Sequence, residues 1–190
     1  MSVDRILVGL GCALCVGLAG CSSSSSGPPA AAYVQASVSG AACDLAPTLF
    51  TIGSLATPAP NGSAGTTVSC SVHANSGGFD VTLQVKQGAN SFKSTGHVPA
   101  DDGTTPNTAG ALTADLDNDA QDVPITLFDG TTCVLSYANP GHGSVEPGRI
   151  WGSLSCTALA DSAKTVSVGV GTETLTCSGT IDFQFTNCAE

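Results

Sequence analysis

The chain has 190 residues, with 5 Lys and Arg against 15 Asp and Glu, and its formal net charge is −10 at pH 7. This length fits a single domain, and the scarcity of basic residues excludes a basic nucleic-acid-binding protein. With 42% hydrophobic and only 11% charged residues, the composition also excludes a coiled coil and a long disordered acidic chain. The negative charge disfavours docking on nucleic acid or directly on an anionic membrane surface.

The first elements along the chain indicate export. Residues Ile6 to Leu18 form an uncharged apolar run. The run is too short to span a bilayer comfortably and is typical of a signal peptide. The basic segment before it is minimal, because Asp4 offsets Arg5. We predict that residues 1–20 are a signal peptide; the alternatives are a short hydrophobic anchor or cleavage at another position.

The sequence Leu18-Ala19-Gly20-Cys21 ends this run, and it resembles the lipobox of bacterial lipoproteins. The resemblance implies that Cys21 becomes the first residue of the mature protein and carries a diacylglycerol group and often a further acyl chain. Two or more acyl chains anchor a protein stably. We therefore expect an exported protein, held through Cys21 on the cell membrane or the outer membrane and facing away from the cytoplasm.

A linker follows the lipobox. Residues 21–32 are rich in Ser, Gly, Pro and Ala and lack apolar periodicity, which is typical of a flexible spacer. At about 3.3 Å per residue, the segment after Cys21 reaches at most roughly 35 Å from a lipid surface. We expect the folded domain to occupy residues 33–190.

Period-two alternation predicts that this domain is all-β. Phe79, Val81, Leu83 and Val85 are separated by polar residues, as in a strand with one buried face. Thr, Ser, Val and Gly dominate, and no segment keeps helical spacing over three turns. We predict an antiparallel β-sandwich of about eight short strands, braced by disulfides. Alternating segments lie at Val68–Val72, Phe79–Val85, Ile125–Leu127, Ile150–Cys156, Val166–Val170 and Ile181–Phe185.

Turns and one long loop are predicted between these strands. Alternation lapses from Gly96 to Asp122, which predicts a long loop with a short strand at Ala111–Leu116. Gly, Asn and Asp tolerate the positive φ of tight turns. They cluster at Asn61-Gly62, Ser76–Gly78, Asp102-Gly103, Asp129-Gly130 and Asn139–Gly141.

The predicted long loop contains a candidate calcium site. Its closely spaced carboxylates resemble the first positions of an EF-hand loop. The rest of that pattern is missing, because Ala120 and Thr126 stand where the loop needs Gly and a bidentate Glu. The alternative is a solvated acidic loop. The candidate ligands are Asp115, Asp117, Asp119 and Asp122.

The cysteines predict disulfides. Cys12 and Cys15 leave with the signal peptide, and an even number remains beside the lipidated Cys21. Such a set in an exported domain implies three disulfides, for which fifteen pairings exist. The spacing contains no C-x-x-C pair, so we predict no metal site among these residues. The pairing that we favour joins Cys156 to Cys177, because these two cysteines flank a single polar segment. The six are Cys43, Cys70, Cys133, Cys156, Cys177 and Cys188.

Catalytic motifs are absent from the sequence. His73, His97 and His142 are scattered, and no H-E-x-x-H or G-x-S-x-G motif occurs. His142 lies in a Gly-rich stretch, where it reads as a turn residue or as a general base beside a distant Asp. We predict no catalytic residue and no cofactor. A pair of catalytic carboxylates, as in a glycosidase, stays possible, because the two residues need to be close in the folded structure but not in the sequence.

Binding is the functional class that the sequence favours. Trp and Tyr on a sheet face can stack on sugar rings or anchor a protein partner, and Arg149 shares the phase of Trp151. Trp151, Tyr137 and Arg149 are therefore the candidate ligand-binding residues. The alternative is that Trp151 covers the core. With 6 Phe, 2 Tyr and 1 Trp, mostly on inward phases, the chain offers little material for a sugar-binding module.

The segments Gly148–Cys156 and Ser178–Cys188 are similar to the end of small actinobacterial lipoprotein antigens. That resemblance implies a surface-anchored β domain without catalysis. We therefore expect a non-catalytic interaction or structural module of the cell envelope, with a protein or glycan partner. A secreted β-sandwich hydrolase and a calcium-dependent adhesion module are the alternatives. A pocket with two carboxylates or a His–Asp pair would favour the hydrolase, and a closed core with a flat polar surface would favour the binding module.

Overall fold

The computed structural model describes residues 27–39, 48–101, 108–118, 125–138, 144–160, 166–167, 172–173 and 176–190. The predicted signal peptide, Cys21 and most of the predicted linker lie outside these residues. No helix long and apolar enough to span a membrane occurs in the described ranges. The sheet begins at Ala31, so the last two residues of the predicted linker, Ala31 and Ala32, belong to a strand and are buried.

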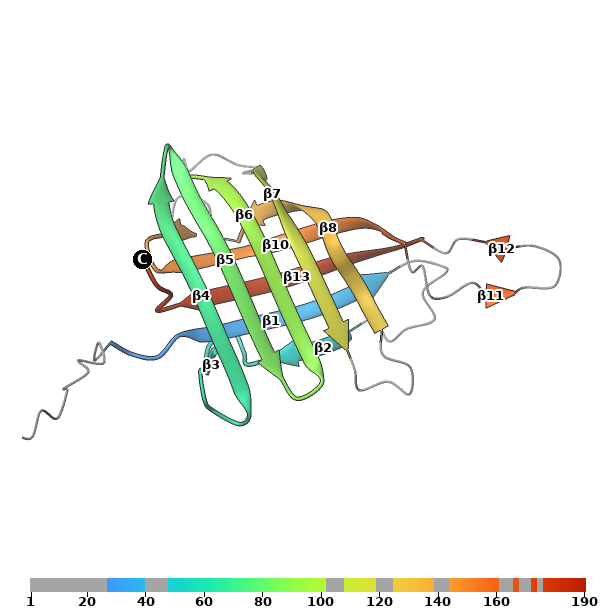
Figure 1. The fold of residues 1–190 in the computed structure, drawn as a ribbon, viewed down its shortest axis with the longest axis horizontal. Coiled ribbons are helices and arrows are strands. Elements are labelled where there is room, and N and C mark those ends of the chain that lie inside the picture. Colours follow the sequence, from blue (N-terminus) through green and yellow to red (C-terminus); the bar gives the residue numbers. More distant parts are fainter. Residues whose placement is uncertain are drawn as a thin grey trace, which may run out of the picture.

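The described chain forms one large antiparallel sheet and a small separate hairpin. The large sheet follows the order β2-β1-β13-β10-β8-β7-β6-β5-β4, with β3 beside β1 and β9 beside β10, while β11 pairs only with β12 (Figure 1). The strands are β1 (Ala31–Ser39), β2 (Thr48–Ile52), β3 (Ala59–Pro60), β4 (Thr66–Asn75), β5 (Gly78–Gln87), β6 (Asn90–Pro99), β7 (Thr108–Asn118), β8 (Ile125–Tyr137), β9 (Val145–Glu146), β10 (Arg149–Ala160), β11 (Val166–Ser167), β12 (Thr172–Glu173) and β13 (Thr176–Thr186).

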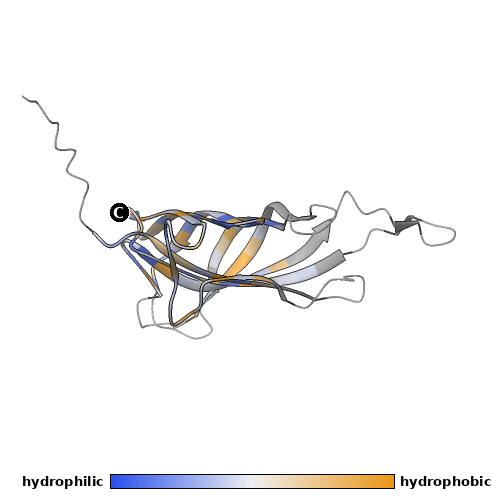
Figure 2. Ribbon diagram, turned by 90° about the horizontal axis from the view of Figure 1, so that it is seen from below, coloured by the Kyte–Doolittle hydropathy of each residue, from blue (hydrophilic) through white to orange (hydrophobic). Residues whose placement is uncertain are grey.

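The sheet curls so that its two halves face each other. Strands β4 to β8 cross in front of β1, β13 and β10 in Figure 1, and the same two layers are seen edge-on in Figure 2. The prediction of an all-β antiparallel fold is confirmed. A sandwich of two separate sheets is not confirmed, because β8 pairs with both β7 and β10 and keeps the sheet continuous.

Alternation produces the core as the sequence predicted. In β5, Val81, Leu83 and Val85 are buried, while the residues between them are exposed. Aromatic contacts join the two halves: Phe92 of β6 packs against Phe183 and Phe185 of β13, with ring centroids 6.0 and 6.3 Å apart. Burial of this apolar surface between the halves is the main stabilising contribution.

Tight turns set the register of the front half of the sheet. Ser76 and Gly77 have φ values of 33° and 84°, as a type I′ hairpin turn requires. This turn, which the sequence predicted at Ser76–Gly78, pairs Asn75 with Gly78. Gly88, with a φ of 58°, begins the next turn, which pairs Gln87 with Asn90. Three long strands are therefore aligned residue by residue.

Two local predictions are wrong. The segment Gly96–Asp122 is not one long loop, because β6 extends to Pro99 and β7 is a strand of 11 residues. Asp129-Gly130 is not a turn but lies within β8. There Thr131 pairs with Ala114, and Phe128 pairs with Leu116. Asp129 and Gly130 therefore lie opposite the single residue Asp115 and form a bulge. The predicted strand Val166–Val170 is confirmed at Val166–Ser167, which pairs with β12 outside the main sheet; residues 168–170 lie outside the described part of the chain.

Two disulfides brace the sheet. Cys70 of β4 bonds to Cys188 near the C-terminal end, and Cys133 of β8 bonds to Cys156 of β10. The favoured pairing of Cys156 with Cys177 is therefore wrong. Ser155 pairs with Val134 across the ladder, which puts Cys156 opposite Cys133 with their Cα atoms 4.4 Å apart. Cys177 instead pairs with Leu159.

We expect a third disulfide between the two remaining cysteines, Cys43 and Cys177. Cys43 lies outside the described residues, but Ser39 at the end of β1 pairs with Ser178, the residue after Cys177. Mapping of peptides from the unreduced protein should recover Cys43 and Cys177 in one linked fragment, which disappears after reduction. Alkylation of either cysteine in the folded, unreduced protein would contradict this expectation.

The outer edge of β4 is covered by other parts of the chain. The amide of Val68 donates to Asn61 Oδ1 at 2.9 Å. The amide of Val72 donates to the Ala189 carbonyl, and the Ala189 amide donates to the Cys70 carbonyl, both at 2.9 Å. The C-terminal segment thus runs beside β4 next to the Cys70–Cys188 bridge.

Candidate functional site

Three side chains form a line across the outer face of the β1–β13–β10 half. Tyr33 pairs with Gln184, and Gln184 pairs with Trp151. Their neighbours along each strand, such as Val34, Phe183 and Ile150, are fully buried, so the three point away from the core. All three are partly exposed. We call Tyr33, Gln184 and Trp151 the aromatic row.

Hydrogen-bond acceptors surround this row. The Tyr33 hydroxyl donates to Gln35 Oε1 at 2.8 Å, and Gln35 pairs in register with Asp182. Burial and then the negative charge of Asp182 raise the pKa of Tyr33, so its hydroxyl stays a donor at neutral pH. Within the described part of the chain, Gln184 Oε1 is a buried acceptor without a hydrogen-bond partner.

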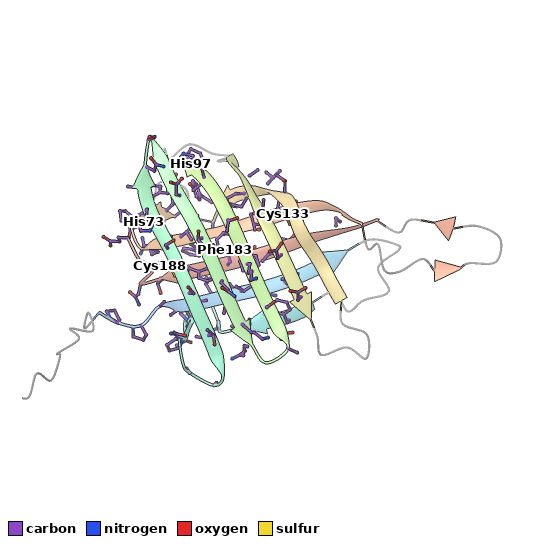
Figure 3. All side chains as sticks on the ribbon, in the orientation of Figure 1. His73, His97, Cys133, Phe183 and Cys188 are labelled. Carbon is purple, nitrogen blue, oxygen red and sulfur yellow. A yellow bond between two sulfur atoms is a disulfide. The ribbon has the colours of Figure 1, made fainter. Side chains whose placement is uncertain are left out.

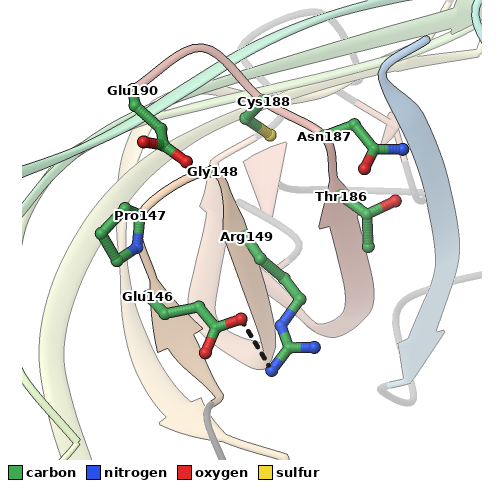
Figure 4. Close-up of a pocket in the computed structure, with 8 residues that line it drawn as sticks. All are labelled: Glu146, Pro147, Gly148, Arg149, Thr186, Asn187, Cys188 and Glu190. Carbon is green, nitrogen blue, oxygen red and sulfur yellow. Dashed lines mark ion pairs between the residues drawn. The ribbon is translucent and has the colours of Figure 1, made fainter. Parts of the chain in front are cut away.

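A shallow pocket of about 320 Å³ adjoins the aromatic row (Figure 4). Two residues that line the pocket connect it to the row. Arg149 lies two residues before Trp151 on the same face of β10, and Thr186 lies two residues after Gln184 on the same face of β13. In the pocket, Arg149 Nη2 lies 3.1 Å from Glu146 Oε1. The pocket also holds a second carboxylate, that of Glu190. Its lining consists of Glu146, Pro147, Gly148, Arg149, Thr186, Asn187, Cys188 and Glu190.

The predicted ligand-binding residues divide between the face and the core. Trp151 and Arg149 lie on the same outer face, as their phase indicated. Tyr137 does not join them, because it is 5% exposed and its hydroxyl donates to the Pro99 carbonyl inside the fold. Burial, with a smaller effect of Asp101, raises the pKa of Tyr137 strongly. Tyr33 was missed, although the alternation of Tyr33, Val34, Gln35 and Ala36 would have marked it as outward-facing.

A second polar cluster lies on the outer face of the other half (Figure 3). His73 pairs with Asp80, and Asp80 pairs with His97. His97 Nδ1 lies 2.8 Å from Asp80 Oδ1, and Asn75 Nδ2 donates to Asp80 Oδ2 at 2.5 Å. His73 and His97, which look scattered in the sequence, thus lie on either side of Asp80, because two short hairpin turns bring β4, β5 and β6 into register. This cluster could have been predicted by counting residues along each strand from the two turns, which shows that His73, Asp80 and His97 lie opposite one another.

We expect Asp80 to titrate below its ordinary pKa. Hydrogen bonds from His97 and Asn75, with smaller charge effects from His97 and His73, lower the pKa of Asp80. Because the folded-state value is depressed, the stability from these contacts is present above the ordinary pKa and is lost as pH falls through the folded value. NMR titration should show the low pKa, and Asn75→Ala should raise it. An unchanged value in Asn75→Ala would contradict the contact.

The candidate calcium ligands are only partly described. Asp115 and Asp117 lie in β7 rather than in a loop, and Ser91 Oγ donates to Asp117 Oδ2 at 3.2 Å. Asp119, Asp122 and His142 lie outside the described residues. In the ranges that the structure does describe, no group of three or more His, Cys, Asp or Glu is arranged to hold a metal ion.

Comparison of the chain with protein-family models, curated proteins and solved structures found no match. Function is therefore argued from the site itself.

Proposed function

We propose that this protein is an exported lipoprotein, anchored in the cell envelope through Cys21, and that it acts as a non-catalytic module that binds a partner outside the cytoplasm. The two facing halves of the curled sheet would serve as a rigid, sandwich-like support. The aromatic row, with the pocket beside it, would be the binding face.

The observation that carries this proposal is the placement of Trp151 and Tyr33 together on the outside of a sheet with a closed apolar interior. The inner faces are filled by aliphatic and Phe side chains together with Tyr137 and the disulfide cysteines, and the core contains neither of these two rings. Trp and Tyr rings that are partly exposed on one rigid face are among the side chains that most often dominate binding energy. Both belong to adjacent parts of one face, so a single partner can cover them.

The disulfides support the export half of the proposal. Cys133 and Cys156 are fully buried, and such bridges form and persist in oxidising compartments outside the cytoplasm. The sheet begins at Ala31, so the spacer after Cys21 reaches at most about 30 Å. That length would hold the sheet close to, but clear of, a lipid surface.

Replacing Cys21 by Ser is expected to abolish the lipid anchor. The native protein should sediment with membranes, and its intact mass should exceed that of the polypeptide from Cys21 to Glu190 by the mass of the acyl groups. Cys21→Ser should carry no acyl mass and should keep its signal peptide, because a hydroxyl does not receive the diacylglycerol group that the signal peptidase requires. Globomycin, which blocks lipoprotein signal peptidase, provides the matched control. A native protein without lipid mass would overturn the anchoring proposal.

A secreted hydrolase is the second candidate, because the pocket contains two carboxylates, Glu146 and Glu190. The outer face of the other half of the sheet also carries the ion pair between His97 and Asp80. Glycosidases use paired carboxylates as acid and base or nucleophile. Under the non-catalytic proposal, the native protein should not hydrolyse aryl glycosides or polysaccharides. If the native protein hydrolyses such a substrate, and both Glu146→Gln and Glu190→Gln abolish the turnover, the protein is a hydrolase rather than a non-catalytic binding module.

A further inference from the structure

We infer that the aromatic row binds a neutral saccharide of the cell envelope. This inference rests on the proposed role as a binding module and names the chemical class of its ligand. It is carried by the spacing of the two rings, the polarity of the groups around them and the charge of the face.

The spacing suits an extended chain of sugar rings. Neighbouring strands are about 4.8 Å apart, and Tyr33 and Trp151 are separated by one strand, with Gln184 between them. Their Cα atoms are therefore about 10 Å apart. The apolar face of a sugar ring stacks on Trp or Tyr, so an oligosaccharide lying across the strands would contact both rings with an amide between them.

The polar groups in and beside the row include acceptor oxygens as well as donors. Gln35 and Asp182 lie in the next register row, and Gln184 Oε1 has no hydrogen-bond partner among the described residues. A buried acceptor without a donor is unfavourable. Sugar hydroxyls are abundant donors, and a small rotation of the Gln184 amide would bring its oxygen to one of them.

The charge of the face selects a neutral ligand. Asp182 lies beside the row, and Arg149 is ion-paired with Glu146. With a chain charge of −10, phosphate-rich or uronate-rich polymers would be repelled. A protein partner is disfavoured for another reason: among the described residues the exposed large hydrophobic side chains are Leu55 and Val134, and neither belongs to the aromatic row, so a large apolar interface is not available there.

Trp151, the only tryptophan of the chain, is a built-in reporter for the test. Cell envelopes are digested with proteinase, and their solubilised polysaccharide is separated by anion exchange into neutral and acidic fractions. These fractions are titrated into the native protein in detergent micelles. We expect the neutral fraction to give a saturable change in Trp151 emission and the acidic fraction to give none. Tyr33→Ala should weaken binding at least about tenfold, while Leu55→Ala, which removes an exposed apolar side chain outside the row, should leave it unchanged.

Binding to whole envelopes separates failure of this inference from failure of the proposed function. Retention of the protein should survive proteinase treatment of the envelopes, disappear after periodate cleaves the vicinal diols of sugars, and be lost in Trp151→Ala. Retention that needs Trp151 but is destroyed by proteinase, or saturable binding of the acidic fraction alone, would overturn the neutral saccharide while leaving a binding module. Retention that is identical in Trp151→Ala and the native protein would overturn both the inference and the proposed binding face.

Discussion

Replacing Cys70 and Cys188 together by Ala is expected to lower the free energy of unfolding by about 5 kcal/mol. The bridge joins residues separated by 118 positions, and the chain-entropy relation gives this loss for a loop of that length closed by this bridge alone, without the shortening that the expected Cys43–Cys177 bridge would add. The Cys133–Cys156 bridge spans only 23 positions, and the same chain-entropy relation gives about 3 kcal/mol for it. The longer bridge also closes the edge of β4 against the C-terminal segment, whose two hydrogen bonds to β4 would weaken with it.

Chemical denaturation of the oxidised proteins measures both losses. The double variant Cys133→Ala with Cys156→Ala is the matched control, because it removes one bridge and leaves the other intact. A greater loss in this control than in the Cys70 and Cys188 variant would contradict loop closure as the dominant effect. Burial of the sulfur atoms of Cys133 and Cys156 would then be the source of the stabilisation.

Phe183→Ala is expected to destabilise the fold by about 3–5 kcal/mol. The side chain is fully buried and lies 6.0 Å from Phe92 and 6.3 Å from Phe185, measured between ring centroids. Its removal leaves a cavity between the two halves of the sheet that neighbouring rings on fixed strands cannot fill. Phe79→Ala, at a partly buried position beside the core, should cost less. Equal losses for Phe79→Ala and Phe183→Ala in urea denaturation would contradict a core centred on these rings.

Combining Phe183→Ala with Phe92→Ala should give less than the sum of the single losses. The two rings are in contact across the core, and contacting residues are not energetically independent. This coupling would show that the two halves of the sheet unfold together.

The sequence predicted those strands in which large apolar residues alternate with polar ones. β4, β5, β10 and β13 meet this condition. β7 was reduced to a short strand because one of its inward positions is Ala114, whose small side chain gives little contrast with outward Thr113. Asp129-Gly130 predicts a turn by composition although it forms a bulge, since the same residue types occur in both structures. Local composition does not distinguish them; the pairing of β8 with β7 does.

The candidate site depended on pairing that a single strand does not reveal. Trp151 and Arg149 were identified because phase can be counted along β10. Tyr137 was misplaced because it belongs to the inward phase of Cys133 and Leu135, which becomes clear only when β8 is paired with β10. Tyr33 and Gln184 became visible as neighbours of Trp151 only through the registers of β1 and β13.

The covered edge of β4 would limit self-association of the protein on the membrane surface proposed above. Molecules tethered there would meet repeatedly at high local concentration, and an open strand edge would pair with the matching edge of a neighbour into a growing ribbon. Here the Ala189 and Asn61 hydrogen bonds already use the β4 groups that such recruitment needs. Trimming the last residues should therefore promote self-association before it impairs the fold, which makes the short C-terminal segment a guard against polymerisation.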